Sequence, residues 1–442
     1  MATGMTNEQA WIELFSKYDI ANAVNQDGLF QISAEQIKEF REPRLMTKFD
    51  HRSQLPSVFL PQQLSILPTS RGDYIIGDMK TFQVLTDNPN VQLVEKTIPA
   101  NIESIDFSAI TSEALAINCA YVSNILSDFT EQENLLPTVS GRMKSDNFSF
   151  TIERNNSSLP PHNIDVNNSQ IEIDGGYEGE TSLVLLEAKN NLCSDFMVRQ
   201  LYYPYRKWER RVRKNVRPVF LEYSNGIFHL REYTFVDPHK YNSLVLVKDK
   251  KYRLRDAELH INTEVLLNLL NSTPLKPEPS APFPQADSFE RVIGLCEVIY
   301  NREEDTYTKD VIGDNTNFTL QPNFTARQVD YYTNAGLYLG LVEKVENSKP
   351  VEFVLSELGM NILSTRSITE RQLKYIKCII SYQVFARVLR LYLENGEVPS
   401  KEQIISIMRE ANLNNMGTDA MYFRRASTVK SWVDWIIRTM DE

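Results

Sequence analysis

The sequence has few cysteines and no long apolar run, and these two absences exclude several classes of protein. Only four cysteines occur among 442 residues, and they lie far apart with no CxxC pair. This pattern argues against a disulfide framework or a cysteine-based zinc site and is typical of a reducing cytoplasm. No apolar run reaches the roughly 18 residues of a membrane span, and the first residues lack the layout of a signal peptide. We therefore expect a cytoplasmic protein.

Positive charge is also scarce overall, but it is concentrated in one segment. The formal net charge is -11, which argues against a general nucleic-acid coat protein. Between residues 199 and 217, however, the single acid Glu209 stands among Arg199, Arg206, Lys207, Arg210, Arg211, Arg213, Lys214 and Arg217. A basic stripe on an acidic protein is either a focused anion-binding site or a solvated helix face.

The length of the chain predicts two or three domains, and a proline-rich segment marks the clearest boundary. Five prolines between Pro274 and Pro284 forbid regular helix and predict an extended linker over residues 273–286. Before it, residues 1–272 combine an N-terminal helical region with a run of strands around one basic helix, which predicts an α/β or α+β core. After it, residues 287–442 are mostly helical. Their order of helix, turn, helix and short hairpin indicates a winged-helix-like domain.

An acid and a base stand two residues apart at the end of the apolar stretch LVLLEAKNN. Since side chains alternate along a strand, Glu187 and Lys189 project to one face while Ala188 packs on the other. Upstream, QIEID ends in Asp174 and is followed by a Gly-Gly turn, so a hairpin would bring Asp174 beside Glu187. Paired carboxylates without a nearby histidine suit Mg²⁺, and the lysine can position a water or stabilise charge on a phosphate. The competing interpretation is a surface hairpin whose Glu and Lys face water.

Ile173 and Asp174, twelve further residues, and then Glu187-Ala188-Lys189 resemble the PD-(D/E)XK motif of the nuclease superfamily that includes type II restriction endonucleases. The resemblance covers about residues 140–215, with Ile173 in place of the proline. It implies a restriction-endonuclease-like core, a mixed sheet flanked by helices. It also implies that Asp174 and Glu187 bind Mg²⁺ and that Lys189 orients or activates the attacking water.

Further residues are predicted to support this site. Gln200 and Tyr203 match a Gln and a Tyr that such enzymes often carry in the helix after the motif. Glu153, at the end of FSFTIE, is a candidate third acid, and an exposed strand residue is the alternative. Asp165 competes with Asp174 as the first acid, but the segment before Asp165 reads as a proline-bound loop whereas IEID reads as a strand.

Three basic segments are predicted to contact DNA. Residues 140–150 resemble a flexible basic loop, residues 199–217 would track phosphates and make binding salt-dependent, and the helix around residues 423–433 has a polar face suited to the major groove. The predicted contacts are Arg142, Lys144, Arg199, Arg206, Lys207, Arg210, Arg211, Arg424, Arg425, Ser427, Thr428 and Lys430. The helix with Arg327, Gln328, Tyr331 and Tyr332 is either an equivalent reading helix or a core helix. The basic stretch with Arg41, Arg44, Lys48 and Arg52 is a second recognition arm or a loop that covers the core.

The resemblance and the basic segments together predict a Mg²⁺-dependent, sequence-specific endonuclease for double-stranded DNA, of the type II restriction class. Such an enzyme cuts two strands, so a homodimer is expected, and the resemblance implies a partner methyltransferase that protects host sites. Two rivals remain. One is a repair or recombination nuclease that reads DNA structure, and the other is a non-catalytic winged-helix regulator.

Overall fold

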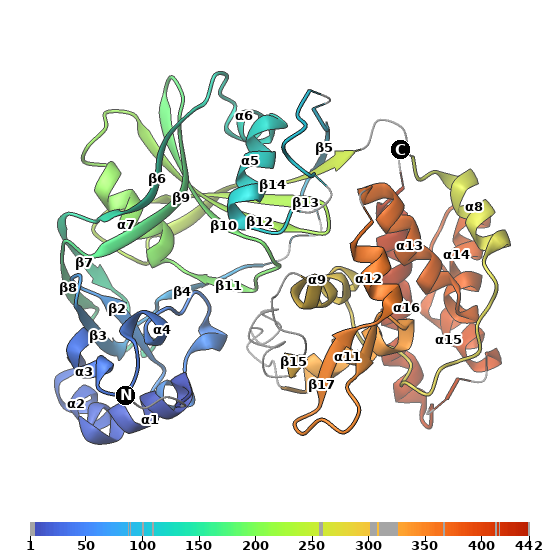
Figure 1. Ribbon diagram of the computed structural model, residues 1–442, viewed down its shortest axis with the longest axis horizontal. Helices are drawn as coiled ribbons and strands as arrows, with labels where there is room; N and C mark the ends of the chain where they lie inside the picture. The colour runs from blue at the N-terminus through green and yellow to red at the C-terminus, as the bar shows by residue number, and fades with distance from the viewer. Residues whose placement is uncertain are drawn as a thin grey trace.

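The computed structural model describes residues 5–440 except 87, 89, 100, 108–109, 256–259, 301–306, 309–325, 366, 412 and 415. Its centre is a seven-stranded mixed sheet in the order β5-β14-β13-β12-β10-β9-β6 (Figure 1). The strands are β5 (Leu93–Thr97), β6 (Leu136–Lys144), β9 (Gln170–Glu178), β10 (Ser182–Lys189), β12 (Asn215–Ser224), β13 (Ile227–Phe235) and β14 (Leu244–Arg255). Strand β10 runs parallel to β12 and β14 runs parallel to β5, whereas the other neighbours are antiparallel.

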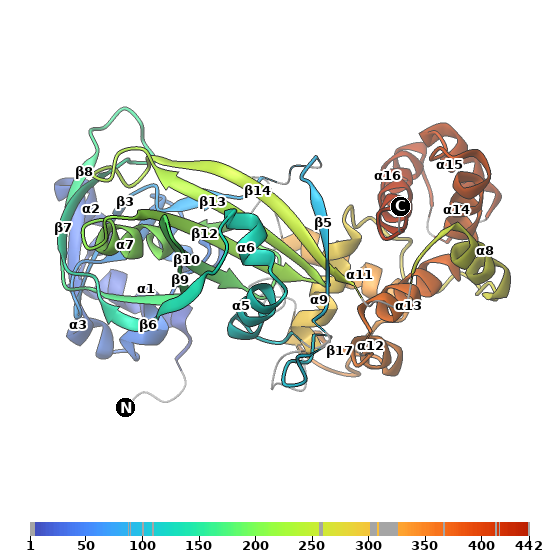
Figure 2. The ribbon, with the colours of Figure 1, turned by 90° about the horizontal axis from the view of Figure 1, so that it is seen from above.

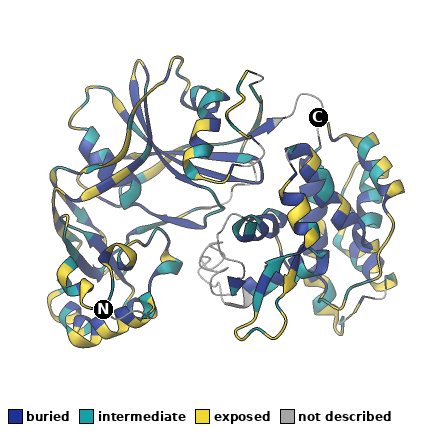
Figure 3. Cartoon of the chain, in the orientation of Figure 1, coloured by how far each residue is buried: buried dark blue, intermediate teal, exposed yellow. Residues whose placement is uncertain are grey.

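Strand β10 is buried along its whole length because both faces of the sheet are covered, as its continuous apolar sequence predicts (Figure 3). On one face, Val184, Leu186 and Ala188 pack in a core shared with α5 (Glu113–Val122) and α6 (Ile125–Thr130). On the other face, Leu183 and Leu185 pack with side chains of α7 (Arg199–Trp208). Glu187 and Lys189 share this second face and interrupt its apolar pattern, so they need polar partners there.

The N-terminal part is not only helical, as the sequence predicts, but also contains a small antiparallel sheet, β1-β3-β2. Its elements are α1 (Asn7–Lys17), α2 (Ile20–Asp27), β1 (Leu29–Ser33), α3 (Ala34–Lys38), α4 (Pro43–Met46), β2 (Leu64–Pro68) and β3 (Asp73–Asp78), with short 3-10 turns at Arg52–Gln54 and Ser57–Phe59. Trp11 and Ile76 belong to one continuous core with Phe150 and Tyr202. The N-terminal part therefore shares its core with α7 and with the two-stranded sheet of β7 (Asn147–Ile152) and β8 (His162–Asn167).

The C-terminal part is mostly helical. It holds α8 (Thr263–Ser272), α9 (Phe289–Tyr300), α11 (Ala326–Leu339), α12 (Glu357–Leu363), α13 (Ile368–Ile380), α14 (Gln383–Asn395), α15 (Lys401–Glu410) and α16 (Asp419–Arg438). A three-stranded sheet, β15-β17-β16, is formed by β15 (Tyr307–Thr308), β16 (Val342–Lys344) and β17 (Glu352–Leu355). Figure 2 shows α13–α16 beyond the edge of the central sheet at which β5 and β14 lie. Within the described part of the chain, none of the helices has the length and apolarity needed to cross a membrane.

The proline-rich segment, residues 273–286, contains no helix or strand, but it packs against the C-terminal core. Phe283 stacks on Phe385 with ring centroids 5.6 Å apart. Helix α8 also belongs to this core through Leu266 and Leu270, so the predicted boundary at residue 272 falls after a helix of the C-terminal part. Glu297 of α9 joins the two parts, because it accepts hydrogen bonds from Ser224 Oγ (2.8 Å) and Asn225 N (3.0 Å) at the β12–β13 turn.

Several local predictions need correction. The Gly175–Gly176 pair is not a turn but lies within β9, where a Cβ on Gly176 would lie 2.8 Å from Val139 of β6. Glycine is needed there because the two strands approach closely. Residues 140–144 are not a flexible loop but the end of edge strand β6. Helix α9 begins after Ser288, whose Oγ accepts a hydrogen bond from Arg291 N.

Candidate functional site

Two neighbouring strands bring Asp174 and Glu187 together. The antiparallel ladder of β9 and β10 ends with the pair Gly175 and Leu186, and Asp174 and Glu187 are the residues next to this pair on the two strands. The backbone N–H of Ala188 donates a hydrogen bond to Asp174 Oδ2 at 2.9 Å. The other candidate first acid, Asp165, is exposed on β8 in a different sheet. The register therefore favours Asp174 over Asp165 as the partner of Glu187.

Lys189 lies in the middle of a group of carboxylates. Its Nζ is 2.6 Å from Glu187 Oε1, 3.7 Å from Glu113 Oε1 and 3.8 Å from Asp50 Oδ2. Only 7% of the lysine side chain is exposed, so these anions are what stabilises its charge inside the protein. Glu113 comes from the first turn of α5 and Asp50 comes from the N-terminal part. The lysine thus ties the strand to two elements that are distant in the sequence.

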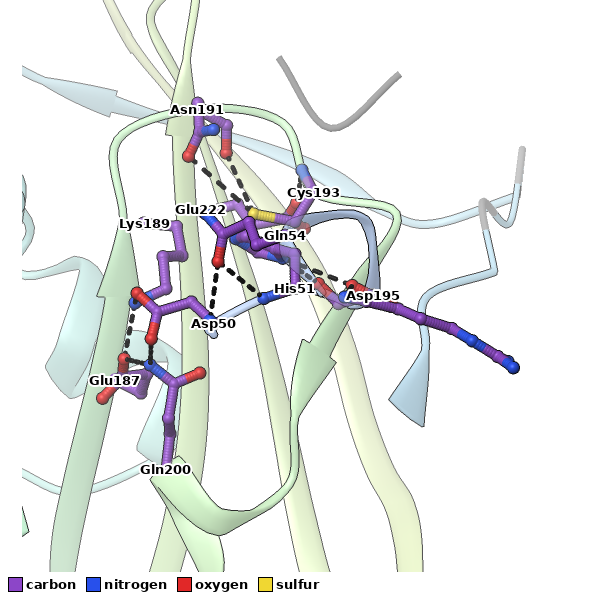
Figure 4. A network of polar contacts seen from close by, with 11 residues as sticks. Asp50, His51, Gln54, Glu187, Lys189, Asn191, Cys193, Asp195, Gln200 and Glu222 are labelled. Carbon is purple, nitrogen blue, oxygen red and sulfur yellow. Dashed lines mark hydrogen bonds and ion pairs between the residues drawn. The ribbon is translucent and has the colours of Figure 1, made fainter. Parts of the chain in front are cut away.

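Gln200 reaches the same group from the start of α7 (Figure 4). Its side-chain Nε2 donates to Glu187 Oε1, and it also donates to Asp50 Oδ1 at 3.2 Å. Its Oε1 atom is buried and has no hydrogen-bond partner. The predicted supporting role of Gln200 therefore has a geometric basis, since its amide nitrogen contacts one predicted metal ligand.

Burial makes both predicted metal ligands easier to protonate. Burial raises the pKa of Glu187 to about 8, although Lys189 opposes this shift. Burial likewise raises the pKa of Asp174 against the hydrogen bond from Ala188. Burial alone would lower the pKa of Lys189, but Glu187, Asp50 and Glu113 together raise it well above its usual value. The lysine is thus a permanent cation, and the two adjacent carboxylates need further positive charge to be ionised together.

The donor set suits a hard divalent cation. Asp174 and Glu187 supply carboxylate oxygens, and the amide nitrogen of Gln200, not its oxygen, faces Glu187. Within the described ranges there is no group of three or more His, Cys, Asp or Glu arranged to hold a metal ion. Mg²⁺ fits this limited set, because it commonly binds through one or two carboxylates and completes its coordination with waters and substrate phosphates.

Three protein-family models match the chain. They describe domains of unknown function: DUF6996 matches residues 8–76, DUF6997 matches residues 77–253 and DUF7226 matches residues 291–441. No curated protein and no solved structure matches the chain. Asp174, Glu187, Lys189 and Gln200 all fall in the second matched segment, whereas Asp50 falls in the first. The polar group therefore joins two segments that are described as separate domains.

Sequence reasoning missed Asp50 and Glu113. The stretch that contains Asp50 was interpreted only by its basic residues, and Asp50 is an acid among them. Lys48 and Arg52 are exposed, whereas Asp50 and the buried His51 point toward the sheet. The structure thus favours the second interpretation of this stretch, a loop that covers the core.

Glu153 and Tyr203 do not join the polar group. Glu153 follows β7, is exposed and forms an ion pair with Lys80 at 3.0 Å, because β7 belongs to the separate two-stranded sheet. Tyr203 is fully buried between α7 and the N-terminal part, and its hydroxyl donates to the carbonyl of Pro68 at 3.0 Å. Both predictions of a supporting role in the site are therefore corrected, and Tyr203 acts in packing.

The basic segment of α7 is divided between buried and exposed side chains. Arg206 is 1% exposed, donates to Ser149 O (3.1 Å) and Tyr202 Oη (2.8 Å), and lies over the Phe148 ring. Lys207 is also buried, and it donates to Lys144 O and pairs with Asp146. These two residues cannot contact DNA, because their charged groups serve the protein interior.

The remaining basic residues of this region are accessible to different degrees. Arg199 is half-buried and lies over the ring of Tyr203. Arg210 and Arg211 are about half exposed, at 45% and 50%, and pair with Glu209 and Asp146. Arg142 is 47% exposed and pairs with Glu172, and Lys144 is exposed at the end of β6. These side chains stay candidates for DNA contact.

The predicted DNA-contact residues of helix α16 are also divided between exposed and buried side chains. Arg424, Ser427 and Lys430 are exposed along one face, whereas Arg425 and Thr428 are buried. Phe423, at the start of this face, is also exposed, at 54%. In α11, Tyr332 is buried and donates to Asp287, as expected of a core helix, and the side chains of Arg327 and Gln328 lie outside the described residues.

Arg206→Met is expected to lower the free energy of unfolding by about 1–3 kcal/mol, because the hydrogen bonds of the buried guanidinium to Ser149 O and Tyr202 Oη would be lost. Urea denaturation measures this change. DNA affinity at constant salt should stay as in the wild type. Arg210→Met, at an exposed position two residues after the helix ends, serves as the control and should unfold like the wild type. A stable Arg206→Met protein with weakened DNA binding would contradict the structural role.

Proposed function

We propose that the protein is a Mg²⁺-dependent endonuclease that cleaves double-stranded DNA at specific sequences, as type II restriction enzymes do. The observation that carries the proposal is the meeting of Asp174, Glu187 and Lys189 at adjacent strand positions. Gln200 from the following helix completes the group. The surrounding mixed sheet flanked by helices agrees with the fold that the PD-(D/E)XK resemblance implies. The proposal includes a homodimer, because two strands must be cut, and a partner methyltransferase that protects the host sites.

The chemistry follows from the charges of these residues. Hydrolysis of a phosphodiester needs a water in line with the leaving oxygen and positive charge where negative charge develops. Asp174 and Glu187 would hold Mg²⁺, which when bound supplies Lewis acidity and lowers the pKa of a coordinated water. Lys189 stays protonated, so it acts by orienting the water and stabilising the phosphate charge rather than by accepting a proton. Gln200 restrains the Glu187 carboxylate.

The C-terminal part is proposed to read the DNA. Its first unit has the order α9, β15, α11, β16 and β17, with β16 and β17 paired as an antiparallel hairpin, which agrees with a winged-helix arrangement. Its second unit, α15 and α16, pairs two helices and has no hairpin among its described residues. The exposed face of α16 offers Arg424, Ser427 and Lys430 for contacts with phosphates and base edges.

The experiment that tests the proposal is digestion of unmethylated phage and plasmid DNA by the purified protein, with Mg²⁺ or with EDTA. Glu187→Ala is the matched control. Discrete fragments that require Mg²⁺ and disappear with Glu187→Ala are the expected result, and sequencing the fragment ends gives the recognition site. A smear, or cutting only of forks and junctions, would replace the restriction function by a structure-directed nuclease. Intact DNA together with metal-independent binding to a specific site would favour the non-catalytic regulator.

Replacing Arg424 and Lys430 together with alanine is expected to weaken DNA binding uniformly across sequences. If each side chain neutralises one phosphate, the slope of log K against log salt should decrease in size by about 0.9 for each phosphate that is no longer neutralised. Binding measured in EDTA at several salt concentrations checks this. Arg387→Ala is the control, since Arg387 is 41% exposed on α14 and pairs with Glu410. An unchanged slope would remove α16 from the DNA-binding surface.

A further inference from the structure

Glu187 and three neighbouring side chains form a closed ring of polar contacts (Figure 4). Lys189 Nζ lies 2.6 Å from Glu187 Oε1 and 3.8 Å from Asp50 Oδ2. Gln200 Nε2 donates both to Asp50 Oδ1, at 3.2 Å, and to Glu187 Oε1. Asp50 therefore lies opposite Glu187 in the ring and contacts the same two partners through its two oxygens.

Asp50 is itself held in place by its backbone. Its N–H donates to Gln54 Oε1 at 2.7 Å, and its carbonyl accepts from Met197 N at 2.9 Å. Met197 belongs to β11 (Asp195–Met197), the short strand just before α7, which pairs with β4 (Phe82–Val84). Only 17% of the Asp50 side chain is exposed. The carboxylate is thus presented by a rigid segment rather than by a mobile loop.

The next residue anchors the segment a second time. His51 is buried, and its Nδ1 lies 2.8 Å from the backbone oxygen and 3.3 Å from the side-chain Oδ1 of Asp195. Asp195 is 2% exposed. This pair fixes the covering loop to β11, directly beside the carboxylate that enters the ring.

We propose that Asp50 is a positioning residue of the site, so that the N-terminal part is an integral component of the active centre. This inference rests on the proposed nuclease function. The lysine side chain has four rotatable bonds, and besides Glu187 its ammonium group has two anionic neighbours, Glu113 at 3.7 Å and Asp50 at 3.8 Å. Asp50 differs from Glu113 in that it also accepts a hydrogen bond from Gln200 Nε2. An anion on each side holds the ammonium between them, and the shared Gln200 amide aligns the two carboxylates. Removing such a partner commonly costs 10–100-fold in the activity of a metal-dependent site.

Asp50 is expected to act on the reaction rate and not on DNA affinity, because it faces Lys189 and Gln200 inside the protein. Asp50→Ala removes both contacts and should lower the single-turnover cleavage rate by about 10–100-fold. Asp50→Asn keeps an oxygen that can accept from Gln200 but loses the charge near Lys189, so its rate should fall between those of the wild type and Asp50→Ala. The DNA dissociation constant, measured with Ca²⁺ in place of Mg²⁺, should change less than about two-fold in both variants.

The matched control is Lys48→Ala. Lys48 also pairs with Asp50, at 3.8 Å, but its side chain is 74% exposed and lies outside the ring. This variant should cleave at close to the wild-type rate. Melting temperatures identify any variant that fails to fold. If Asp50→Ala does not fold, the cleavage rate of Asp50→Asn tests the positioning role instead.

A second measurement does not depend on cleavage. In the NMR spectrum of ¹⁵N-glutamine-labelled protein, the side-chain amide of Gln200 can be assigned by its loss in Gln200→Ala. Its signal should move in Asp50→Ala and stay unchanged in Lys48→Ala. If the wild type and Asp50→Ala cut DNA equally fast, or if the Gln200 signal does not move, the positioning role is overturned while the nuclease function stands. If the wild type cuts no DNA but the signal moves, the nuclease function fails while the contact that Asp50 makes in the ring is supported.

Discussion

Glu187→Gln is expected to lower the rate of Mg²⁺-dependent DNA cleavage by at least about 10²-fold. Glutamine keeps the size of the side chain but removes the charge that would hold the cation beside Asp174. The fold should survive, because Lys189 keeps Asp50 and Glu113 as anionic neighbours at 3.8 and 3.7 Å. Single-turnover cleavage of a plasmid that carries one recognition site measures the loss, and circular dichroism checks the fold.

Two further variants at the predicted site and one control variant outside it extend this test. Asp174→Ala and Lys189→Ala should abolish cleavage as well, whereas DNA binding persists in both. Glu178→Gln is the control on the same pair of strands, since Glu178 lies at the other end of β9 and pairs with Lys214. Cleavage by Asp174→Ala at the wild-type rate would mean that Asp174 is not the first acid.

Arg231→Met is expected to lower the free energy of unfolding by about 3–5 kcal/mol. Arg231 and Glu222 form an ion pair in which the side chains are 6% and 3% exposed. Glu222 also accepts from Cys193 N at 2.6 Å, and Arg231 Nη2 lies 2.9 Å from His229 Nδ1. Removing the guanidinium leaves the Glu222 carboxylate buried without its cation, which is the costly half of breaking a buried pair. Equilibrium denaturation in urea measures the change.

The double variant Glu222→Gln/Arg231→Met should be less destabilised than the sum of its two single variants, because the second change removes the unpaired charge. Arg142→Met, in the exposed pair with Glu172, should change stability by no more than about 1 kcal/mol. Additive effects of Glu222→Gln and Arg231→Met would show that the two side chains do not depend on each other.

The segment before Asp165 was interpreted as a proline-bound loop, but it belongs to strand β8 (His162–Asn167). Local sequence patterns did predict the strands β9, β10, β12, β13 and β14, because their apolar residues are dense or alternate. Strand β6 was missed for the opposite reason. It is an edge strand whose side chains are almost all exposed, and it contains Pro137 and Gly141, so it has no apolar pattern to read. The apolar residues of 113–129 recur with a helical period that predicts one helix, but the chain forms two helices, α5 and α6, separated at Asn124, which has a left-handed backbone (φ 57°). Asparagine tolerates that conformation better than most residues, but its presence alone does not predict it.

The sequence could predict only those residues of the site that lie close together along the chain. Asp174, Glu187 and Lys189 are separated by short distances along adjacent strands, so their spacing and the period of a strand bring them together. Asp50 is brought to the site only by the packing of the N-terminal part on α7 and β11, which no local pattern encodes. Arg206 is a second residue whose surroundings could not be predicted from the local sequence. Its position in a basic run indicates a solvated side chain, whereas its partners are a backbone carbonyl on β7 and aromatic rings.

The core that joins the N-terminal part to α7 has a consequence for synthesis on the ribosome. Side chains from α1 to β3 are made first, but their packing partners extend to Tyr241. At about 5–20 residues per second, translation from residue 76 to residue 241 takes on the order of 10–30 s. During this interval the apolar faces of the first helices and strands have no complete core to pack against. We therefore expect the nascent N-terminal part to depend on protection by the ribosome surface or by chaperones until the second half of the sheet emerges.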